Sequence, residues 1–388
     1  FTPQTADALS SGRVGSVMGI RDSLQRVRRC LGCHGPNDQR GAWDVWRKWE
    51  PLKTLCSSTM KAIRIHQTGD LSVIQCDNVS APKEIGPEDV LIKPEIAGVN
   101  CIDTYFRSGH FHVQLPFTLG QECGGKVARI GESVKDIQPG DYVVALAGSS
   151  FAERVVAPRS KVTKLPKELD TRTAVAAWLQ GLTAVTLTHA AYQIKRGDYV
   201  LVHAAAGGTG LMLVQVAKAL GAHVIGTTST TEKAERAKTL GAEHVLLYKD
   251  DIVGRVNELT SGKGVNVVYD SVGKSTLDQS LEVLAQHGSL ILFGESSGAP
   301  DPLPVHLLRP KNIKFMCFAL YGYLNTQEEY EHFSGILLDL LVSDKVHANV
   351  WREYLLSAEG VQQAQQELMS RTTTGKLLIR IPPSPDEA

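Results

Sequence analysis

The 388-residue chain has no excess charge of either sign, because 41 Lys and Arg residues balance 41 Asp and Glu residues. This balance argues against a protein that coats nucleic acid or adheres to anionic membranes through a basic surface. No apolar run approaches the roughly 18 residues that a membrane-spanning helix needs. With 43% hydrophobic and 21% charged residues, the composition is typical of a globular chain. At roughly 150 residues per domain, the length predicts two to three domains.

Cysteine is also scarce, with seven residues in the whole chain. An odd and small number argues against a secreted disulfide scaffold and favours a reducing compartment. We therefore expect a globular protein whose stability comes from its core.

The first 59 residues differ from the rest. They contain nine Lys or Arg residues and five acidic residues, and they show no sustained strand-like alternation. We expect residues 1–59 to be a disordered or targeting leader, either a mitochondrial transit peptide or upstream translated sequence. The expected location is the cytoplasm, or the mitochondrial matrix if the leader is a cleaved transit peptide.

From Met60 onward, short alternating segments separated by glycine-rich turns predict a β-rich region. Residues 61–65 alternate as a half-buried strand does, and residues 89–94, 120–127 and 139–144 continue the pattern. Short strands at this spacing predict a small barrel-like domain.

The periodicity changes near residue 170. Residues 171–191 are rich in Ala and Leu at helical spacing, and residues 199–202 form a continuous apolar run typical of a buried parallel strand. Further strands are predicted at 224–227, 245–247, 265–270 and 289–294, with helices at 207–221 and 233–240 among them. Repeated βα units of this kind predict a doubly wound parallel sheet. A helix at 328–343 and a last strand at 376–380 follow.

A glycine-rich loop lies between the first parallel strand and the helix after it. When the segment from His203 is aligned with a Gly-x-Gly-x-x-Gly pattern, Ala205, Gly207 and Gly210 take the three glycine positions. Gly207 would let the backbone approach a pyrophosphate, Gly210 would let the helix pack closely, and the helix N-terminus would bind the phosphates. This context predicts a dinucleotide site; a glycine turn needed only for packing is the alternative.

The end of the second parallel strand favours NADPH over NADH. A carboxylate there would bind the ribose 2′-OH of NADH, but the position falls at Thr227 or Thr228. Ser229, Lys233 and Tyr248 follow, and hydroxyl and ammonium groups suit a 2′-phosphate that a carboxylate would repel. The alternative for Lys233 is a solvated helix charge.

Several segments together resemble one family, the zinc-independent quinone oxidoreductases (zeta-crystallin group) of the medium-chain dehydrogenase/reductase superfamily. The resemblance runs from Met60 to about Ile381 with the blocks in family order, and the leader has no counterpart. The segments are Gly98–Gly109, Gly181–Thr183, His203–Gly210, Asp270–Gly273 and Phe293–Gly298.

The resemblance implies an α/β protein with two domains. A GroES-like β-rich catalytic domain would comprise residues 60–184, a Rossmann domain residues 185–318, and residues 319–388 would return to the catalytic domain. It also implies a homodimer formed through the Rossmann domains. NADPH would contact Gly208 and Thr209 with its pyrophosphate, and Ser229, Lys233 and Tyr248 with its 2′-phosphate. Residues near the rest of the cofactor would be Thr183, Ser271, Phe293 and Gly294.

The resemblance also implies catalysis without a metal. Zinc-dependent relatives have a Cys where this chain has Asn100 and a His where it has Gln121, and neither amide is a good zinc ligand. No Cys occurs between Cys123 and Cys317, so the four-cysteine structural zinc lobe is missing as well.

Three residues are candidates for the chemistry. Asn100 could hydrogen-bond the cofactor carboxamide or the substrate oxygen, and Tyr105 offers a phenol as donor or proton relay. Asp103 could orient its neighbours, or it could be only a turn or cap residue. For Tyr105 the alternative is an aromatic side chain that only lines the wall of the cleft. Relatives often have a second Tyr where this chain has Phe111, which puts a two-tyrosine clamp in doubt.

The function that the resemblance implies is NADPH:quinone reduction, by hydride or single-electron transfer. The alternatives are reduction of enones or enoyl thioesters, and a non-catalytic NADPH-binding role as a crystallin or RNA-binding protein. The neutral charge gives no basis for strong RNA binding.

Overall fold

The computed structural model describes residues 59–383. These residues belong to one compact unit, Ser58–Ala388, and the predicted leader lies outside them except for Thr59. Within the described range, no helix is long and apolar enough to cross a membrane.

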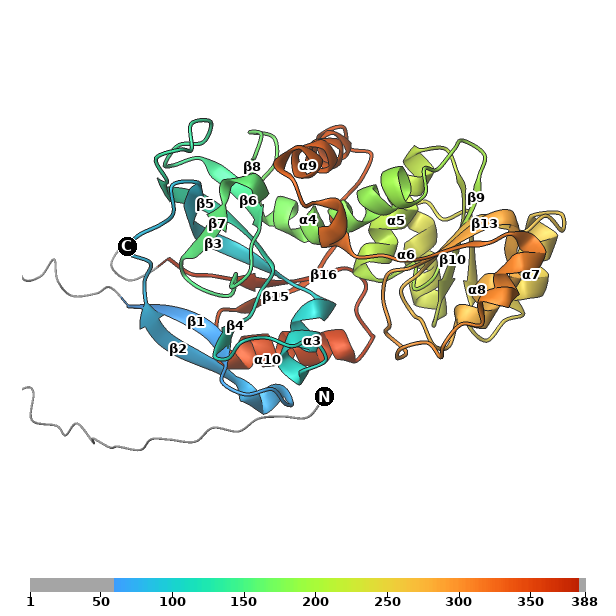
Figure 1. Ribbon diagram of the computed structural model, residues 1–388, viewed down its shortest axis with the longest axis horizontal. Helices are drawn as coiled ribbons and strands as arrows, with labels where there is room; N and C mark the ends of the chain where they lie inside the picture. The colour runs from blue at the N-terminus through green and yellow to red at the C-terminus, as the bar shows by residue number, and fades with distance from the viewer. Residues whose placement is uncertain (1–58, 384–388) are drawn as a thin grey trace, which may run out of the picture. The chain divides into compact units, whose positions relative to one another are not determined.

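The β-rich part contains two sheets (Figure 1). In the larger sheet the strand order is β15-β16-β3-β5-β6-β8, with β7 paired to β3, and the smaller sheet has the order β2-β1-β4. All pairs are antiparallel except β15 with β16. The strands are β1 (Thr59–Ile65), β2 (Ile74–Ser80), β3 (Asp89–Val99), β4 (Phe117–Thr118), β5 (Glu122–Ile130), β6 (Tyr142–Leu146), β7 (Val155–Pro158), β8 (Val162–Lys164), β15 (Val350–Leu355) and β16 (Lys376–Arg380).

The chain returns to this sheet at its C-terminal end. Strand β16 pairs with β3, so that Leu377 faces Val99 and Ile379 faces Ala97, and all four side chains are buried. On the other side of β3, a Cβ at Gly125 of β5 would lie 2.0 Å from the Lys93 carbonyl oxygen. A glycine is required there because the two backbones approach so closely.

The second part is a six-stranded sheet in which every pair is parallel. Its order, β11-β10-β9-β12-β13-β14, is that of a doubly wound Rossmann sheet. The central strand β9 is the predicted apolar run, and Val200, Leu201 and Val202 are fully buried because helices cover both faces. The strands are β9 (Tyr199–Val202), β10 (His223–Thr228), β11 (His244–Leu247), β12 (Val265–Asp270), β13 (Leu284–Leu292) and β14 (Lys314–Cys317). The fold class predicted from the sequence is confirmed.

The described helices include α3 near the start of the β-rich part and four helices between the parallel strands. They are α3 (Cys101–Ser108), α4 (Thr171–Thr186), α5 (Gly208–Ala219), α6 (Thr231–Thr239), α7 (Ile252–Leu259), α8 (Leu277–Glu282), α9 (Gln327–Val342) and α10 (Ala358–Met369).

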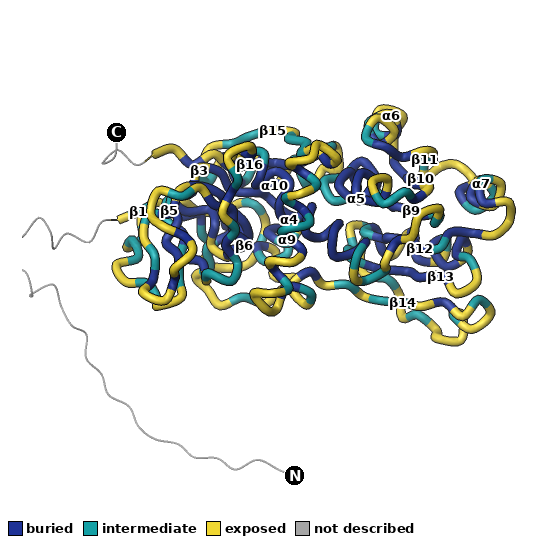
Figure 2. Tube along the Cα trace, turned by 90° about the horizontal axis from the view of Figure 1, so that it is seen from above, coloured by how far each residue is buried: buried dark blue, intermediate teal, exposed yellow. Residues whose placement is uncertain are grey.

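Helix α4 packs against both parts and is buried along most of its length (Figure 2). It contacts β5 and β6 on one side and α5 on the other. The indole N–H of Trp178, also fully buried, donates to the Tyr330 hydroxyl of α9 at 3.1 Å. The helix predicted at 171–191 begins at the predicted residue. Its α-helical part ends at Thr186, and a π-helical turn continues to Ala191.

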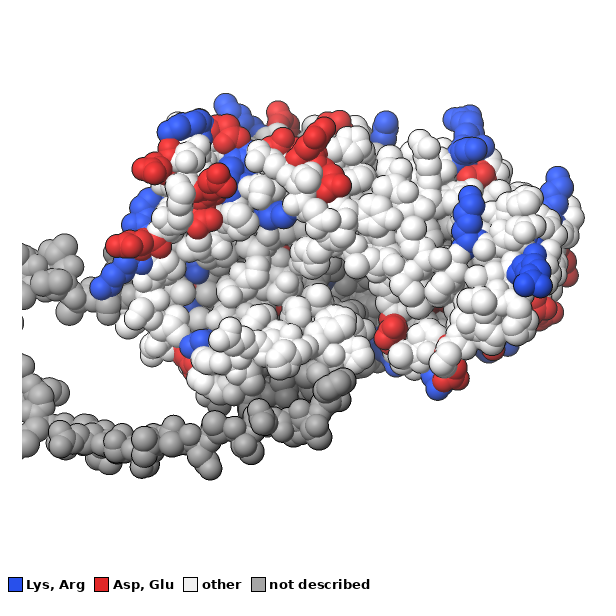
Figure 3. Space-filling model, in the orientation of Figure 1, with Lys and Arg blue, Asp and Glu red and all other residues white. Residues whose placement is uncertain are grey.

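Charged side chains of both signs are intermingled on the face drawn in Figure 3. They gather over the β-rich part and again over the far end of the parallel sheet, and no large patch of one sign is visible on this face.

Candidate functional site

The predicted cofactor residues come together at the carboxyl ends of the parallel strands. The glycine loop follows β9, Ser229 follows β10, Tyr248 follows β11, Ser271 follows β12, and Phe293 and Gly294 follow β13. Ligands of doubly wound sheets bind at this edge, where the strand order reverses. Here the reversal lies between β9 and β12, which are adjacent in the sheet.

The glycine loop has the shape that a pyrophosphate needs. A Cβ at Gly210 would lie 2.3 Å from the Ala204 carbonyl oxygen and 2.8 Å from the Ala205 Cα, so glycine is required for the helix to pack on the loop. Gly207 is the N-cap of α5 and has no side-chain cap, and a Cβ there would have no neighbour nearer than 3.3 Å. Gly208 and Thr209 form the first turn of α5, whose N–H groups are free for phosphate oxygens. These residues fit a dinucleotide.

The end of β10 and the turn after it carry hydroxyl groups and the Lys233 ammonium, and the last two residues of the strand are threonines where a carboxylate would bind a free ribose 2′-OH. Thr227 and Thr228 are the last two residues of β10, and both are buried. The Tyr248 hydroxyl accepts a hydrogen bond from the Ala204 N–H at 2.8 Å, which ties it to the glycine loop. Lys233 lies in the first turn of α6, and its ammonium group donates to the backbone carbonyl of Arg371.

Arg371 was not among the predicted residues. It follows α10, its guanidinium donates to the Ser296 carbonyl at 2.6 Å, and its backbone meets Lys233. No local motif marks this arginine, because its place beside α6 depends on the return of the C-terminal segment.

Thr183 lies on α4, where its hydroxyl donates to the Leu179 carbonyl at 2.8 Å. Ser271 and Gly294 are in close contact, since a Cβ at Gly294 would lie 2.9 Å from the Ser271 carbonyl oxygen. The Phe293 N–H donates to the Asp270 carbonyl at 2.8 Å, so the ends of β12 and β13 are held together.

Asn100 and Asp103 together cap the N-terminus of helix α3. Asn100 is the N-cap, and its N–H donates to an Asp103 carboxylate oxygen at 2.8 Å. The other oxygen of Asp103 accepts the Gly120 N–H at 3.1 Å. Burial raises the pKa of Asp103 to about 7, against the lowering effect of these N–H donors. Of the two roles left open for Asp103, the geometry matches that of a cap residue.

The side-chain amide of Asn100 is fully engaged within the protein. Its oxygen accepts from the Lys376 ammonium and from the Gln180 amide, each at 2.7 Å. Its nitrogen donates to Glu122 at 3.0 Å and to the Gly98 carbonyl at 3.2 Å. The predicted hydrogen bond from Asn100 to substrate or cofactor would have to replace one of these partners.

The group that surrounds Asn100 is a buried charged network that the sequence did not reveal. The Lys376 ammonium lies 2.5 Å from Glu122 and 2.7 Å from the Gln180 amide oxygen. Glu122 also accepts the Leu179 N–H at 2.8 Å. Lys376 is 276 residues from Asn100 along the chain.

These residues do not fit a zinc ion. Asn100 and Gln121 present amides, and the cation beside Asn100 is the protein's own Lys376 ammonium. The Gln121 amide donates to the Gly120 carbonyl at 2.9 Å and accepts the Tyr321 hydroxyl at 3.2 Å. Among residues 59–383, no three His, Cys, Asp or Glu side chains are grouped to hold a metal ion.

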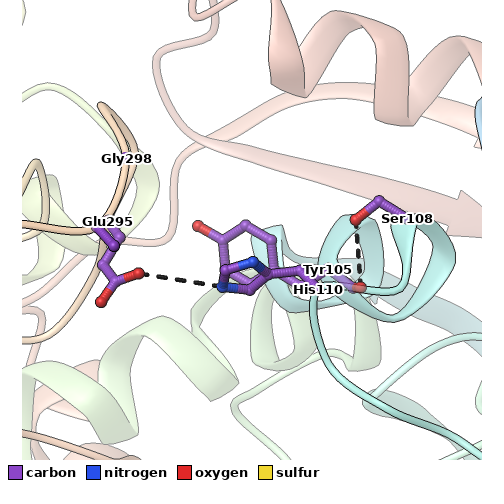
Figure 4. A pocket seen from close by; sticks show the side chains of 6 residues that line it. Tyr105, Ser108, His110, Glu295 and Gly298 are labelled. Atoms are coloured by element: carbon purple, nitrogen blue, oxygen red, sulfur yellow. Dashed lines mark hydrogen bonds and ion pairs between the residues drawn. The ribbon is translucent and has the colours of Figure 1, made fainter.

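Tyr105 lines a separate pocket of about 250 Å³. Figure 4 shows its ring beside His110 and facing Glu295 from the loop after β13. The ring centroids of Tyr105 and His110 are 5.1 Å apart, and His110 Nε2 lies 4.0 Å from the Glu295 carboxylate. Burial raises the pKa of the Tyr105 phenol, so it keeps its proton at neutral pH. The remaining lining residues are Ser108, Gly298 and Ala299.

The three predicted catalytic residues are thus divided between two environments. Asn100 and Asp103 are buried at the start of α3, whereas Tyr105 faces the pocket. Phe111 packs against Tyr105 with its ring edge-on and a centroid distance of 5.5 Å, and it carries no hydroxyl.

Both parts of the chain match known families. Residues 86–167 match the family described as "Alcohol dehydrogenase GroES-like domain", and residues 208–339 match "Zinc-binding dehydrogenase". The second description names a zinc-binding family, but this chain has the amides of Asn100 and Gln121 where zinc-dependent relatives have ligands.

Individual relatives extend the similarity over nearly all of the described residues. A probable quinone oxidoreductase of Schizosaccharomyces pombe is 39% identical over 319 residues, which cover 82% of this chain and 96% of the relative. The 2-haloacrylate reductase of a Burkholderia species is 36% identical over 307 residues, which cover 76% of this chain and 91% of the relative. The crystal structure of Escherichia coli quinone oxidoreductase complexed with NADPH superposes with a TM-score of 0.79 at 37% identity, covering 82% of this chain and 99% of that one.

Proposed function

The chain belongs to the quinone oxidoreductases of the medium-chain dehydrogenase/reductase superfamily, and we propose that it is an NADPH-dependent quinone reductase. The observation that carries the proposal is the match to quinone oxidoreductases across both the β-rich part and the parallel sheet. The Escherichia coli structure contains NADPH, and the groups at the end of β10 here are of the kind that suit its 2′-phosphate.

The residues that would hold NADPH lie along the carboxyl edge of the parallel sheet. Gly207, Gly208, Thr209 and Gly210 would bind the pyrophosphate through the free N–H groups of α5. Ser229, Lys233 and Tyr248 would bind the 2′-phosphate, and Thr183, Ser271, Phe293 and Gly294 would line the rest. The Lys233 ammonium has three donors, so its hydrogen bond to the Arg371 carbonyl leaves two for the 2′-phosphate.

NADPH, when bound, supplies the electrons for reduction of the acceptor. Tyr105 keeps its proton and donates a hydrogen bond to the acceptor oxygen as negative charge develops there. The buried network of Lys376, Glu122 and Gln180 fixes the amide of Asn100 and thereby the start of α3, the helix that carries Tyr105. Asp103 stabilises the same helix end as its cap.

The test is to follow NADPH absorbance with the purified chain and a series of acceptors. Rapid NADPH oxidation with ortho- or para-quinones, and slow oxidation of NADH, is the expected result. Turnover with enals but with no quinone would contradict the proposal.

A second candidate is reduction of electron-poor alkenes. The similarity to a 2-haloacrylate reductase favours it, because that enzyme's name describes reduction of an activated alkene on a related scaffold. Offering 2-chloroacrylate beside the quinones distinguishes the two activities in one assay.

We further propose that the chain forms a homodimer through the parallel sheet. Strand β14 is an edge strand, and the 3₁₀ turn before it, Val305–Lys311, exposes Val305 and Leu307. An unpaired edge beside apolar side chains favours pairing with a second copy. Light scattering after gel filtration tests this, and a monomer would contradict it.

The domain division at residues 60–184, 185–318 and 319–388 also stays a proposal. It is supported by the sheets, since the seven-stranded sheet uses strands only from 89–164 and 350–380, and the parallel sheet only from 199–317. The location of the protein, in the cytoplasm or in the mitochondrial matrix, also stays a prediction.

A further inference from the structure

The pocket beside Tyr105 has an aromatic wall and a wall that carries a carboxylate. Tyr105 and His110 line the aromatic side, and Phe111 packs against both, with centroid distances of 5.5 Å and 5.1 Å. The other wall is the loop after β13, which contributes Glu295 and two small residues. Flat rings pack well on aromatic side chains, so this geometry suits a quinone.

The Glu295 carboxylate points into the pocket. Figure 4 shows it directed toward Tyr105 and His110, and it lies 4.0 Å from His110 Nε2. The Glu295 side chain is 38% exposed, and carboxylates with access to water are in general ionised at neutral pH. Burial, the Cys101 thiol and the Glu295 carboxylate all raise the pKa of the Tyr105 phenol. The negative charge of Glu295 therefore acts at the place where the acceptor would bind.

The lining of this pocket offers no permanent cation. Every lining residue belongs to the described range, and none of them is Lys or Arg. Two cations contact the same loop outside the lining, and both are engaged by oxygen atoms. Lys274 pairs with Asp301 at 3.2 Å, and the Arg371 guanidinium donates to the Ser296 carbonyl at 2.6 Å.

The charge of the acceptor itself matters in such a pocket. A quinone is neutral, and the negative charge that develops on its oxygen during reduction would meet the Tyr105 hydroxyl as a donor. An acceptor with a carboxylate or sulfonate group adds a permanent negative charge. Like charges in a site that is partly shielded from water repel each other, so Glu295 would weaken the binding of such an acceptor.

We propose that Glu295 is a specificity-determining residue that excludes anionic acceptors from the pocket beside Tyr105 and favours neutral ones. The inference rests on the proposed function, because it assumes that the acceptor binds beside Tyr105. It predicts that 2-chloroacrylate, which is an anion, is a poor acceptor for this chain, although a relative is named for the reduction of 2-haloacrylates.

The experiment compares 1,4-naphthoquinone with 1,4-naphthoquinone-2-sulfonate, which share a ring system and differ in charge. For each acceptor, kcat/KM is measured with the full chain at saturating NADPH, and the ratio of the two values is the preference. The assay is run at pH 8, at which imidazoles are in general uncharged, so that no imidazolium offsets the Glu295 charge. Glu295→Gln keeps the shape of the side chain and removes its charge. The intrinsic difference in reactivity between the acceptors cancels when the wild type and the variant are compared.

We expect Glu295→Gln to lower the preference for the neutral quinone by about fivefold to tenfold, mainly through a higher kcat/KM for the sulfonate. Raising the ionic strength from about 0.02 M to about 0.5 M should lower the preference in the wild type and hardly change it in the variant, because salt screens the Glu295 charge. An unchanged preference in Glu295→Gln would overturn the inference while leaving quinone reduction intact. A wild-type chain that reduces no quinone would instead refute the proposed function.

Glu258→Gln is the matched control for the net charge of the protein. Glu258 lies on α7, where its exposed side chain pairs with Arg255, and α7 contributes no residue to the pocket. This variant should keep the wild-type preference. A loss of preference as large as that in Glu295→Gln would show that net charge, and not the carboxylate in the pocket, discriminates between the acceptors.

Discussion

The ammonium of Lys376 lies 2.5 Å from the Glu122 carboxylate, and the two side chains are 2% and 0% exposed. Lys376 comes from β16 and Glu122 from β5, the two strands on either side of β3. The ion pair therefore ties the last strand of the chain to the centre of the β-rich part. Both partners also bind the amide of Asn100, so the same pair fixes the start of α3.

We expect Lys376→Met to destabilise the protein by about 3–5 kcal/mol, because it leaves Glu122 buried without a cation. The double variant Lys376→Met/Glu122→Gln removes both charges and should recover much of that loss. Urea unfolding of the three proteins at neutral pH measures the difference. If Lys376→Met were as stable as the wild type, the ion pair would contribute nothing to the stability of the fold.

Asp103 should make stability depend on pH. Its pKa is about 7 in the folded protein against 3.8 as the ordinary value, so between these pH values the folded state binds the additional proton. The stability associated with this group is complete below about pH 4 and is lost as the pH rises through 7, a change of about 4 kcal/mol at most. Asp103→Asn should flatten the dependence of unfolding free energy on pH in this window. An unchanged slope would mean that the carboxyl group ionises normally in the folded state.

Tyr105→Phe should lower kcat with quinones by about a hundredfold, because the donor to the developing oxyanion is removed. Binding of NADPH should be unaffected, since the phenol faces the pocket beside Glu295. Ser108→Ala is the matched control: it lines the same pocket, and its hydroxyl reaches only the Tyr105 carbonyl, at 3.3 Å. Stopped-flow measurement of NADPH oxidation checks both variants, and full turnover in Tyr105→Phe would exclude the phenol as donor.

The parallel sheet could be predicted from the sequence because its strands are local signals. Residues 199–202 are an apolar run and residues 265–270 are rich in Val, and both are strands with these bounds. Helix α10 is harder to recognise, because its apolar residues Val361, Ala364 and Leu368 are few among polar neighbours.

The candidate site was predictable only where its residues belong to a motif. The glycine loop and the start of α3 each lie within one short segment. Lys376 reaches Asn100 from 276 residues away, and Arg371 reaches Lys233 from 138 residues away. Such contacts depend on the return of the C-terminal segment, and no spacing in the sequence encodes them.

Lys233→Ala should weaken NADPH binding about tenfold and leave NADH binding unchanged, because only the 2′-phosphate needs the ammonium. Lys238→Ala is the charge-matched control on the same helix, since Lys238 is exposed and pairs with Glu235 at 3.0 Å. Fluorescence titration with both dinucleotides measures the two affinities. An equal effect of the two substitutions would reduce Lys233 to a general surface charge.

Gly210 and Gly207 should respond differently to alanine. At Gly210 the new Cβ would lie 2.3 Å from the Ala204 carbonyl oxygen, a backbone atom that cannot move without shifting the loop, so Gly210→Ala should lower both Tm and NADPH affinity. At Gly207 the nearest atom is 3.3 Å away and φ is −75°, so Gly207→Ala should fold with a Tm close to that of the wild type. Its methyl group would still occupy the space that the pyrophosphate needs, and NADPH affinity should fall by about tenfold or more. Thermal unfolding with and without NADPH separates the two effects, and wild-type affinity in Gly207→Ala would show that the dinucleotide does not approach the loop at this residue.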